Sequence, residues 1–244
     1  MKSFYSTDDS SIDRDRLEAQ LNVLISLLPK ASSSAEKAQL YYQIGSLLDK
    51  LAYELDAETY YLAAANVFDQ LLSTVSLGTD KDDLKRQKAQ ALLRVGEIRL
   101  SLNLDGSRKA FDLVNEIAIA LQDKLLQAIA KYRLGSIEKN ERNLQDALKS
   151  YQEAERLIRL AGGLASESLR AKILSSIVLI QQRIDSETAY NLARNINEGE
   201  GGLLEPARKP VLDLPDNPEF IEFSLTPANT GAGQENRPTW PKLP

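Results

Sequence analysis

The sequence predicts an all-α protein followed by a proline-rich C-terminal segment. Residues 1–197 contain a single proline, Pro29, whereas the other eight prolines lie after residue 205. Proline lacks the backbone N–H and breaks helices, so only the first part of the chain can consist of helices. In that part apolar residues recur at helical spacing, as in Leu17, Leu21, Leu24 and Leu28, and no segment alternates with the period of a strand.

Helix boundaries follow from the breakers between the apolar stripes. Thr79 and Asp80 resemble an N-cap followed by an acidic first turn, and Gly162 stands where a C-cap glycine belongs. Residues 1–10 and 198–244 are expected to be disordered. Nine helices are predicted, over residues 11–28, 35–52, 55–75, 81–101, 106–121, 123–139, 143–160, 166–183 and 185–197.

The C-terminal segment, residues 198–244, is acidic and flexible in composition. It carries eight acidic and four basic residues, and so holds four of the five net negative charges of the chain. Apolar side chains inside such a segment often fold onto a surface, which predicts docking on the body or on a partner. The alternative is a tail without specific contacts. The docking candidates are Leu212, Leu214, Phe220, Ile221, Phe223, Leu225 and Trp240.

An internal repeat lies within the helical part. Two copies share the same spacing, with twelve residues from a glycine to an alanine, four more to a tyrosine and three more to a second alanine. Two weaker copies start at Gly96, with Ala110 fourteen residues later, and near Ile177, with Ala189 twelve residues later. The two matching copies are Gly45, Ala57, Tyr61 and Ala64, and Gly135, Ala147, Tyr151 and Ala154.

This skeleton resembles the tetratricopeptide repeat family. The intervals between equivalent glycines, 51 and 39 residues, are similar to the longer units of the kinesin-light-chain type, although no unit ends with the family's proline. The resemblance implies an α-solenoid of antiparallel helix pairs, in which glycine and alanine allow close approach. Its units would be 35–75, 81–121, 123–161 and 166–197, in a domain of residues 11–197 that the helix 11–28 caps.

The resemblance also implies a binding surface, because the first helix of each pair lines the concave face of such a stack. The positions of the family's chaperone-binding clamp hold Tyr42, Ser46, Leu93 and Glu97, which argues against recognition of chaperone Glu-Glu-Val-Asp tails. Arg94 and Arg133 are either solvated or pair with a carboxylate or phosphate of a peptide. The candidate partner-binding residues are Tyr42, Ser46, Asp49, Arg94, Glu97, Arg133, Ser136 and Lys139.

Composition excludes several kinds of chemistry. The chain has no histidine and no cysteine, so it cannot build a Ser-His-Asp triad, a thiolate nucleophile or a metal site of imidazole or thiolate ligands. We therefore expect no catalytic residues, no metal and no cofactor. The net charge of −5 argues against nucleic acid as a partner. Without an apolar run of about 18 residues we expect no membrane span, and the polar acidic N-terminus predicts a cytoplasmic protein.

The function that fits these observations is non-catalytic protein or peptide binding, as an adaptor, scaffold or assembly factor. A structural subunit that forms homo-oligomers through exposed helix faces is an alternative. Two further functions have less support from the sequence. A 14-3-3-like phosphopeptide binder would need a paired basic and tyrosine signature that the sequence lacks, and a helical enzyme subunit would need two facing carboxylates.

Overall fold

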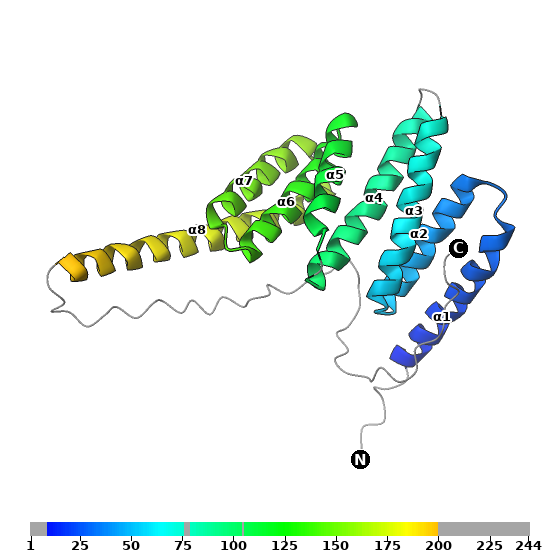
Figure 1. Ribbon diagram of the computed structural model, residues 1–244, viewed down its shortest axis with the longest axis horizontal. Helices are drawn as coiled ribbons and strands as arrows, with labels where there is room; N and C mark the ends of the chain where they lie inside the picture. The colour runs from blue at the N-terminus through cyan, green and yellow to red at the C-terminus, as the bar shows by residue number, and fades with distance from the viewer. Residues whose placement is uncertain (1–8, 76–78, 104, 200–244) are drawn as a thin grey trace, which may run out of the picture. The chain divides into compact units, whose positions relative to one another are not determined.

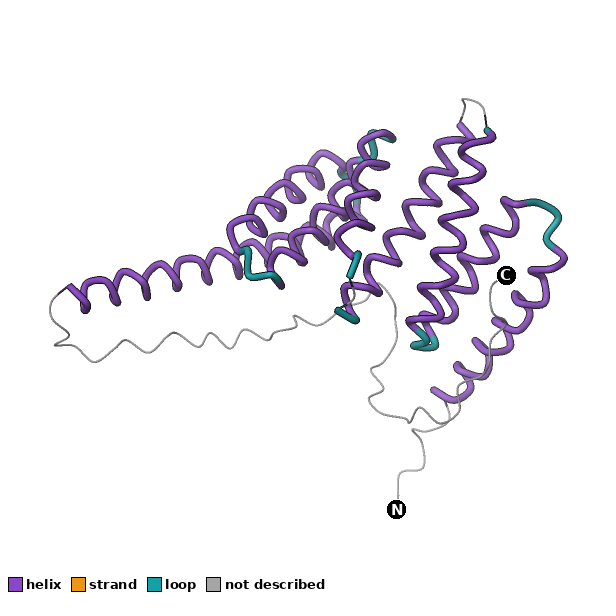
Figure 2. Tube along the Cα trace, viewed as in Figure 1, coloured by secondary structure: helices purple, strands orange, loops and turns teal. Residues whose placement is uncertain are grey.

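The computed structural model describes residues 9–75, 79–103 and 105–199, and these residues form α-helices throughout, with no strand (Figures 1 and 2). The predicted all-α class is confirmed. Outside the described residues lie residues 1–8 and 200–244, and with them most of the segments predicted to be disordered and all the docking candidates from Leu212 to Trp240. The predicted bounds of these segments are wrong by two residues, because residues 9–10 and 198–199 are helical. The helices are α1 (Asp9–Leu27), α2 (Ser34–Lys50), α3 (Glu54–Thr74), α4 (Thr79–Ser101), α5 (Ser107–Ala120), α6 (Lys124–Asn140), α7 (Leu144–Ala161) and α8 (Leu164–Gly199), with a 3-10 turn at Leu28–Lys30.

Each helix packs mainly on the helices that precede and follow it in the chain. The pairs α2–α3, α4–α5 and α6–α7 are hairpins closed by short turns, with α1 packed on α2 and α8 packed on α7 (Figure 1). The first helices of successive pairs also touch, since α4 contacts α6 and α6 contacts α8. This arrangement of stacked helix pairs is an α-solenoid.

One predicted helix end agrees with the structure and one is shifted. α4 begins at Thr79, two residues before the predicted start at residue 81, so Thr79 is the first residue of the helix and not its N-cap. α7 ends at Ala161, and Gly162 follows it with a positive φ of 64° while its N–H bonds to the carbonyl of Ile158. A glycine adopts this φ without the steric cost that a Cβ would add, which explains why the helix stops there.

The last predicted pair is wrong, because the structure has one helix where the sequence predicted two. α8 runs without a break for 36 residues, across the junction predicted near residue 184. No glycine or proline stands there, and the polar side chains bond within the helix, as Gln181 does to Asp185 and Ser186 to the carbonyl of Gln182. The predicted unit 166–197 is therefore a single helix, in which Ile177 packs on the core and Ala189 is exposed.

Each hairpin has the same contact at its centre, a glycine of the first helix against an aromatic ring of the second. A Cβ on Gly45 would lie 3.0 Å from the ring of Tyr61, and one on Gly135 would lie 2.8 Å from the ring of Tyr151. These are the pairs that the repeat predicted. The alanines of both copies, Ala57, Ala64, Ala147 and Ala154, are fully buried beside them.

The second hairpin, α4–α5, contains the same contact, but its aromatic residue is not where the predicted repeat places it. The aromatic residue is Phe111, and a Cβ on Gly96 would lie 2.7 Å from its ring. Ala110 is therefore the residue before the aromatic and not the first alanine of the repeat. The turn has gained two residues, five in 102–106 against three in 51–53, as predicted, but α5 begins closer to its aromatic than α3 does. Phe111 thus follows its glycine by 15 residues, and Tyr61 follows its glycine by 16.

We predict that Gly135→Ala destabilises the protein by about 1–2 kcal/mol. The added methyl group overlaps the ring of Tyr151, which costs about 1–3 kcal/mol, and the higher helix propensity of alanine offsets about 1 kcal/mol of this. Urea unfolding measures the change, with Ser175→Ala at an exposed position of α8 as the control. An equal effect of the two substitutions would contradict the role of the close contact.

Candidate functional site

The partner-binding residues predicted from the repeat lie on the first helices of the three pairs. α2 carries Tyr42, Ser46 and Asp49, α4 carries Arg94 and Glu97, and α6 carries Arg133, Ser136 and Lys139, all of them half-buried. We call the surface formed by these residues of α2, α4 and α6 the first-helix face. The structure thus brings the predicted residues to neighbouring helices, and their role in binding stays a prediction.

Four of these residues form a chain of ion pairs across the three helices, which we call the charge ladder. Arg94 of α4 bonds to Asp49 of α2, and its second amino group lies 2.7 Å from a carboxylate oxygen of Glu97. The other oxygen of Glu97 bonds to Arg133 of α6. The two arginines and two carboxylates balance in charge, so the cations that the sequence offered to a ligand are paired within the protein.

Burial and the neighbouring charges act in opposite directions on Arg94. Burial lowers the pKa of its guanidinium, but the carboxylates of Glu97 and Asp49 outweigh this and raise the pKa above its ordinary value. The ladder is only partly shielded from water, since the side chains of Arg94 and Arg133 remain 33% and 28% exposed. The Nε atom of Arg133 is buried and has no hydrogen-bond partner within the described residues. We infer that the ladder fixes the spacing of α2, α4 and α6.

Tyrosine rings pack next to the ladder and connect it to the hairpin cores. The ring centroids of Tyr42 and Tyr61 are 5.3 Å apart, and those of Tyr132 and Tyr151 are 5.5 Å apart. Burial raises the pKa of Tyr42, Tyr61 and Tyr151, so these phenols stay protonated at neutral pH. Ser136 donates to the carbonyl of Tyr132 at 3.1 Å and accepts from the Tyr151 hydroxyl at 3.4 Å, which already uses its hydroxyl.

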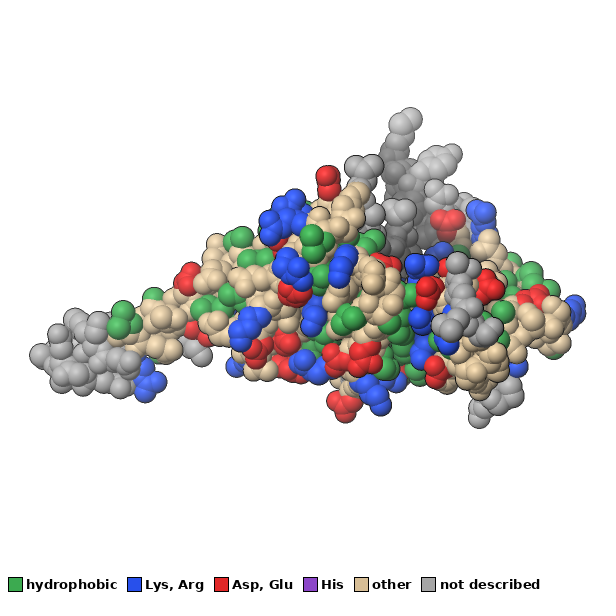
Figure 3. Space-filling model, turned by 90° about the horizontal axis from the view of Figure 1, so that it is seen from above, with side chains coloured by type: hydrophobic (Ala, Val, Ile, Leu, Met, Phe, Trp, Pro, Cys, Tyr) green, Lys and Arg blue, Asp and Glu red, His purple; other side chains and the backbone are tan. Residues whose placement is uncertain are grey.

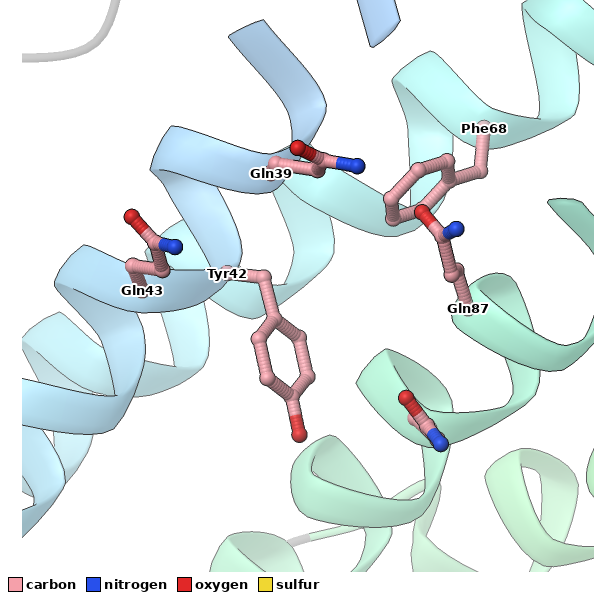
Figure 4. Close-up of a pocket in the computed structure, with 6 residues that line it drawn as sticks. Gln39, Tyr42, Gln43, Phe68 and Gln87 are labelled. Carbon is pink, nitrogen blue, oxygen red and sulfur yellow. The ribbon is translucent and has the colours of Figure 1, made fainter. Parts of the chain in front are cut away.

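A small hollow lies between α2 and α4, and we call it the glutamine hollow (Figure 4). Its volume is about 170 Å³, and the buried side chain of Phe68 from α3 is among its lining residues. Tyr42 extends between the two helices in Figure 4. No hydrogen bond of the four glutamine side chains occurs within the described residues. The glutamines are Gln39 and Gln43 of α2 and Gln87 and Gln90 of α4.

A larger groove lies between α1 and α2, with a volume of about 590 Å³, and we call it the α1–α2 groove. Its wall on α1 is formed by Ala19, Val23 and Leu24, and its wall on α2 includes Leu47 and Ser46. Val23 is 58% exposed, so its side chain is accessible to a partner. The groove also contacts Tyr42 and Gln43, and both residues line the glutamine hollow as well. The two depressions therefore share a wall.

Sequence reasoning found Tyr42 and Ser46 of this surface and missed the rest. The α1 side of the groove was missed because residues 11–28 were interpreted only as a cap of the stack. The spacing of the glutamines could have predicted the glutamine hollow. Gln39 and Gln43 are four residues apart, and Gln87 and Gln90 are three residues apart, on the first helices of successive pairs. Both spacings place two side chains on one side of a helix.

The described surface has no large area of a single charge on the face seen in Figure 3, where acidic and basic side chains are interspersed with apolar ones. Within the described residues no three acidic, histidine or cysteine side chains gather closely enough to hold a metal ion. No described helix is both long and apolar enough to cross a membrane.

We predict that Glu97→Gln destabilises the protein by about 1–2 kcal/mol, because it leaves two partly buried arginines with reduced compensation. The matched control is Glu153→Gln, which removes an exposed pair with Arg156 on the surface of α7 and should cost less than about 0.5 kcal/mol. Thermal and urea unfolding give both values. Equal losses in the two variants would show that the ladder has no special structural role.

Comparison with known proteins gives the fold and no family. No family model and no curated protein matches the sequence, so the tetratricopeptide family remains a resemblance. Among solved structures, the apo form of RapI is similar, with a TM-score of 0.60 at 14% sequence identity. The alignment covers 78% of this chain and 49% of that protein, so the chain spans about half the length of RapI. The likeness establishes a solenoid of helix pairs similar to tetratricopeptide repeats.

Proposed function

We propose that this protein is a non-catalytic adaptor or assembly factor that binds a protein or peptide on its first-helix face, in the cytoplasm. The observation that carries the proposal is the joined surface of the α1–α2 groove and the glutamine hollow, which share Tyr42 and Gln43. The α1–α2 groove and the glutamine hollow together form one depression that is lined by apolar and amide side chains. Binding sites for peptides combine these features, with apolar contacts for affinity and a few polar groups for orientation.

The titratable groups support a non-catalytic role. Glu155 is buried, but Arg159 and Arg170 both pair with it, at 3.0 and 3.2 Å, so it links α7 and α8. The tyrosines of the first-helix face have raised pKa values and are unsuited to act as bases. The described residues therefore offer ion pairs that hold helices together, where an enzyme subunit would need unpaired acids in a pocket.

Self-association is a second candidate function, and the outer surface of α8 favours it. Leu174, Val178 and Leu192 are 42%, 53% and 61% exposed on this helix. α8 also lacks the second helix that follows α2, α4 and α6 in the chain within the described residues. A second copy of α8 could cover these apolar side chains.

We predict that Val23→Glu removes binding of the partner by placing a charge in the apolar wall of the α1–α2 groove. The control is Ile119→Glu, because Ile119 is a similarly exposed apolar residue, at 54%, on α5 and outside the groove. Quantitative mass spectrometry after affinity capture compares wild type and both variants, and circular dichroism checks their folding. Capture of the same proteins by wild type and Val23→Glu would contradict the proposal.

For the second candidate, we predict that wild type sediments as a dimer at micromolar concentration and that Leu174→Glu with Val178→Glu sediments as a monomer. Charges on this surface of α8 would be desolvated in a dimer, which weakens association. Leu160→Glu, at an exposed position of α7, is the control and should leave the dimer intact. A monomeric wild type at the highest soluble concentration would eliminate this candidate.

A further inference from the structure

The α1–α2 groove has a charge of one sign only. Arg16 of α1 and Lys50 of α2 stand at the same end of the groove, because the two helices run in opposite directions along it. Both side chains are exposed, and neither forms an ion pair within the described residues. No acidic residue lines the groove. This distinguishes the two cations from Arg94 and Arg133, whose charges the ladder neutralises.

The other end of the groove leads to amide side chains. Gln43 forms part of the groove and of the glutamine hollow, where Gln39 and Gln87 follow on α2 and α4 (Figure 4). A glutamine side chain has both a donor and an acceptor, as a peptide group does. Unoccupied glutamines on two neighbouring helices can therefore bond to the N–H and C=O groups of an extended chain, whatever its sequence.

The groove thus has cations at one end, and Val23 of α1 and Gln43 of α2 at the other, with Gln20 and Ser46 between them. Seven residues separate Arg16 from Val23 on α1, and seven separate Lys50 from Gln43 on α2, so the two ends lie about 10 Å apart at 1.5 Å per helical residue. An extended peptide advances about 3.3 Å per residue. About three of its residues therefore span the distance from the cations to Val23 and Gln43.

We propose that the α1–α2 groove binds an extended peptide segment of a partner protein that carries an acidic side chain about three residues from a large apolar one. The acidic side chain lies between Arg16 and Lys50, the apolar side chain contacts Val23, and the main chain continues past Gln43 to the other glutamines. The inference rests on the proposed function and adds to it the chemistry of the partner. Charge complementarity carries it, since the only charges in the groove lining are positive.

The test uses the full chain and a library of fluorescein-labelled nonapeptides with a fixed leucine or phenylalanine and with glutamate, glutamine or lysine three residues away. Fluorescence anisotropy should show a preference of about five- to ten-fold for glutamate over glutamine, the size expected for exposed charge pairs. Arg16→Gln with Lys50→Gln should lose this preference and keep the binding of glutamine peptides. Arg16→Lys with Lys50→Arg should retain it, and high salt should reduce it.

The outcomes separate the two proposals. If peptides bind and Val23→Glu abolishes binding, but glutamate gives no advantage, the peptide-binding function stands and the inference on its chemistry fails. If no peptide of the library binds to wild type, the proposed peptide-binding function fails as well. A photo-crosslinking residue at position 23 tests the occupant. Cross-links to a second copy or to another part of the same chain would overturn the assignment to a separate partner.

Discussion

The contact between a glycine and an aromatic ring determines how each helix pair of this protein is built. Gly45, Gly96 and Gly135 allow the ring of the second helix to lie directly on the backbone of the first. A side chain larger than a hydrogen atom at these positions would push the two helices apart. Between one pair and the next, the ion pairs of the charge ladder join α2 to α4 and α4 to α6.

The polar groups of that face divide into two classes with different roles. Asp49, Arg94, Glu97 and Arg133 pair with one another and contribute to the stacking of the pairs. Arg16 and Lys50, together with the glutamines, have no such partners within the described residues and remain available for another molecule. A charged residue on the expected side of a repeat is therefore a candidate for binding only after its partners inside the fold are known.

The fold could be predicted from the sequence where a feature depends on residues close together in the chain. Helix periodicity, Gly162 at a helix end and the two matching repeats all depend on residues close together in the chain, and the structure agrees with them. The contact of Phe111 with Gly96 was missed because the turn is two residues longer while α5 begins closer to its aromatic residue, so the two changes do not cancel. The α1–α2 groove and the pairing of Arg94 with Asp49 involve residues on different helices. No spacing along one helix reveals such contacts.

The packing of each helix mainly on its neighbours in the chain has a consequence for how the protein forms during synthesis. A helix that leaves the ribosome finds the helix that it packs on already present, since contacts between distant parts of the described chain are few. The loops that must close are short, and their entropic cost is low. The order of synthesis from α1 to α8 is thus also an order in which stable structure can grow.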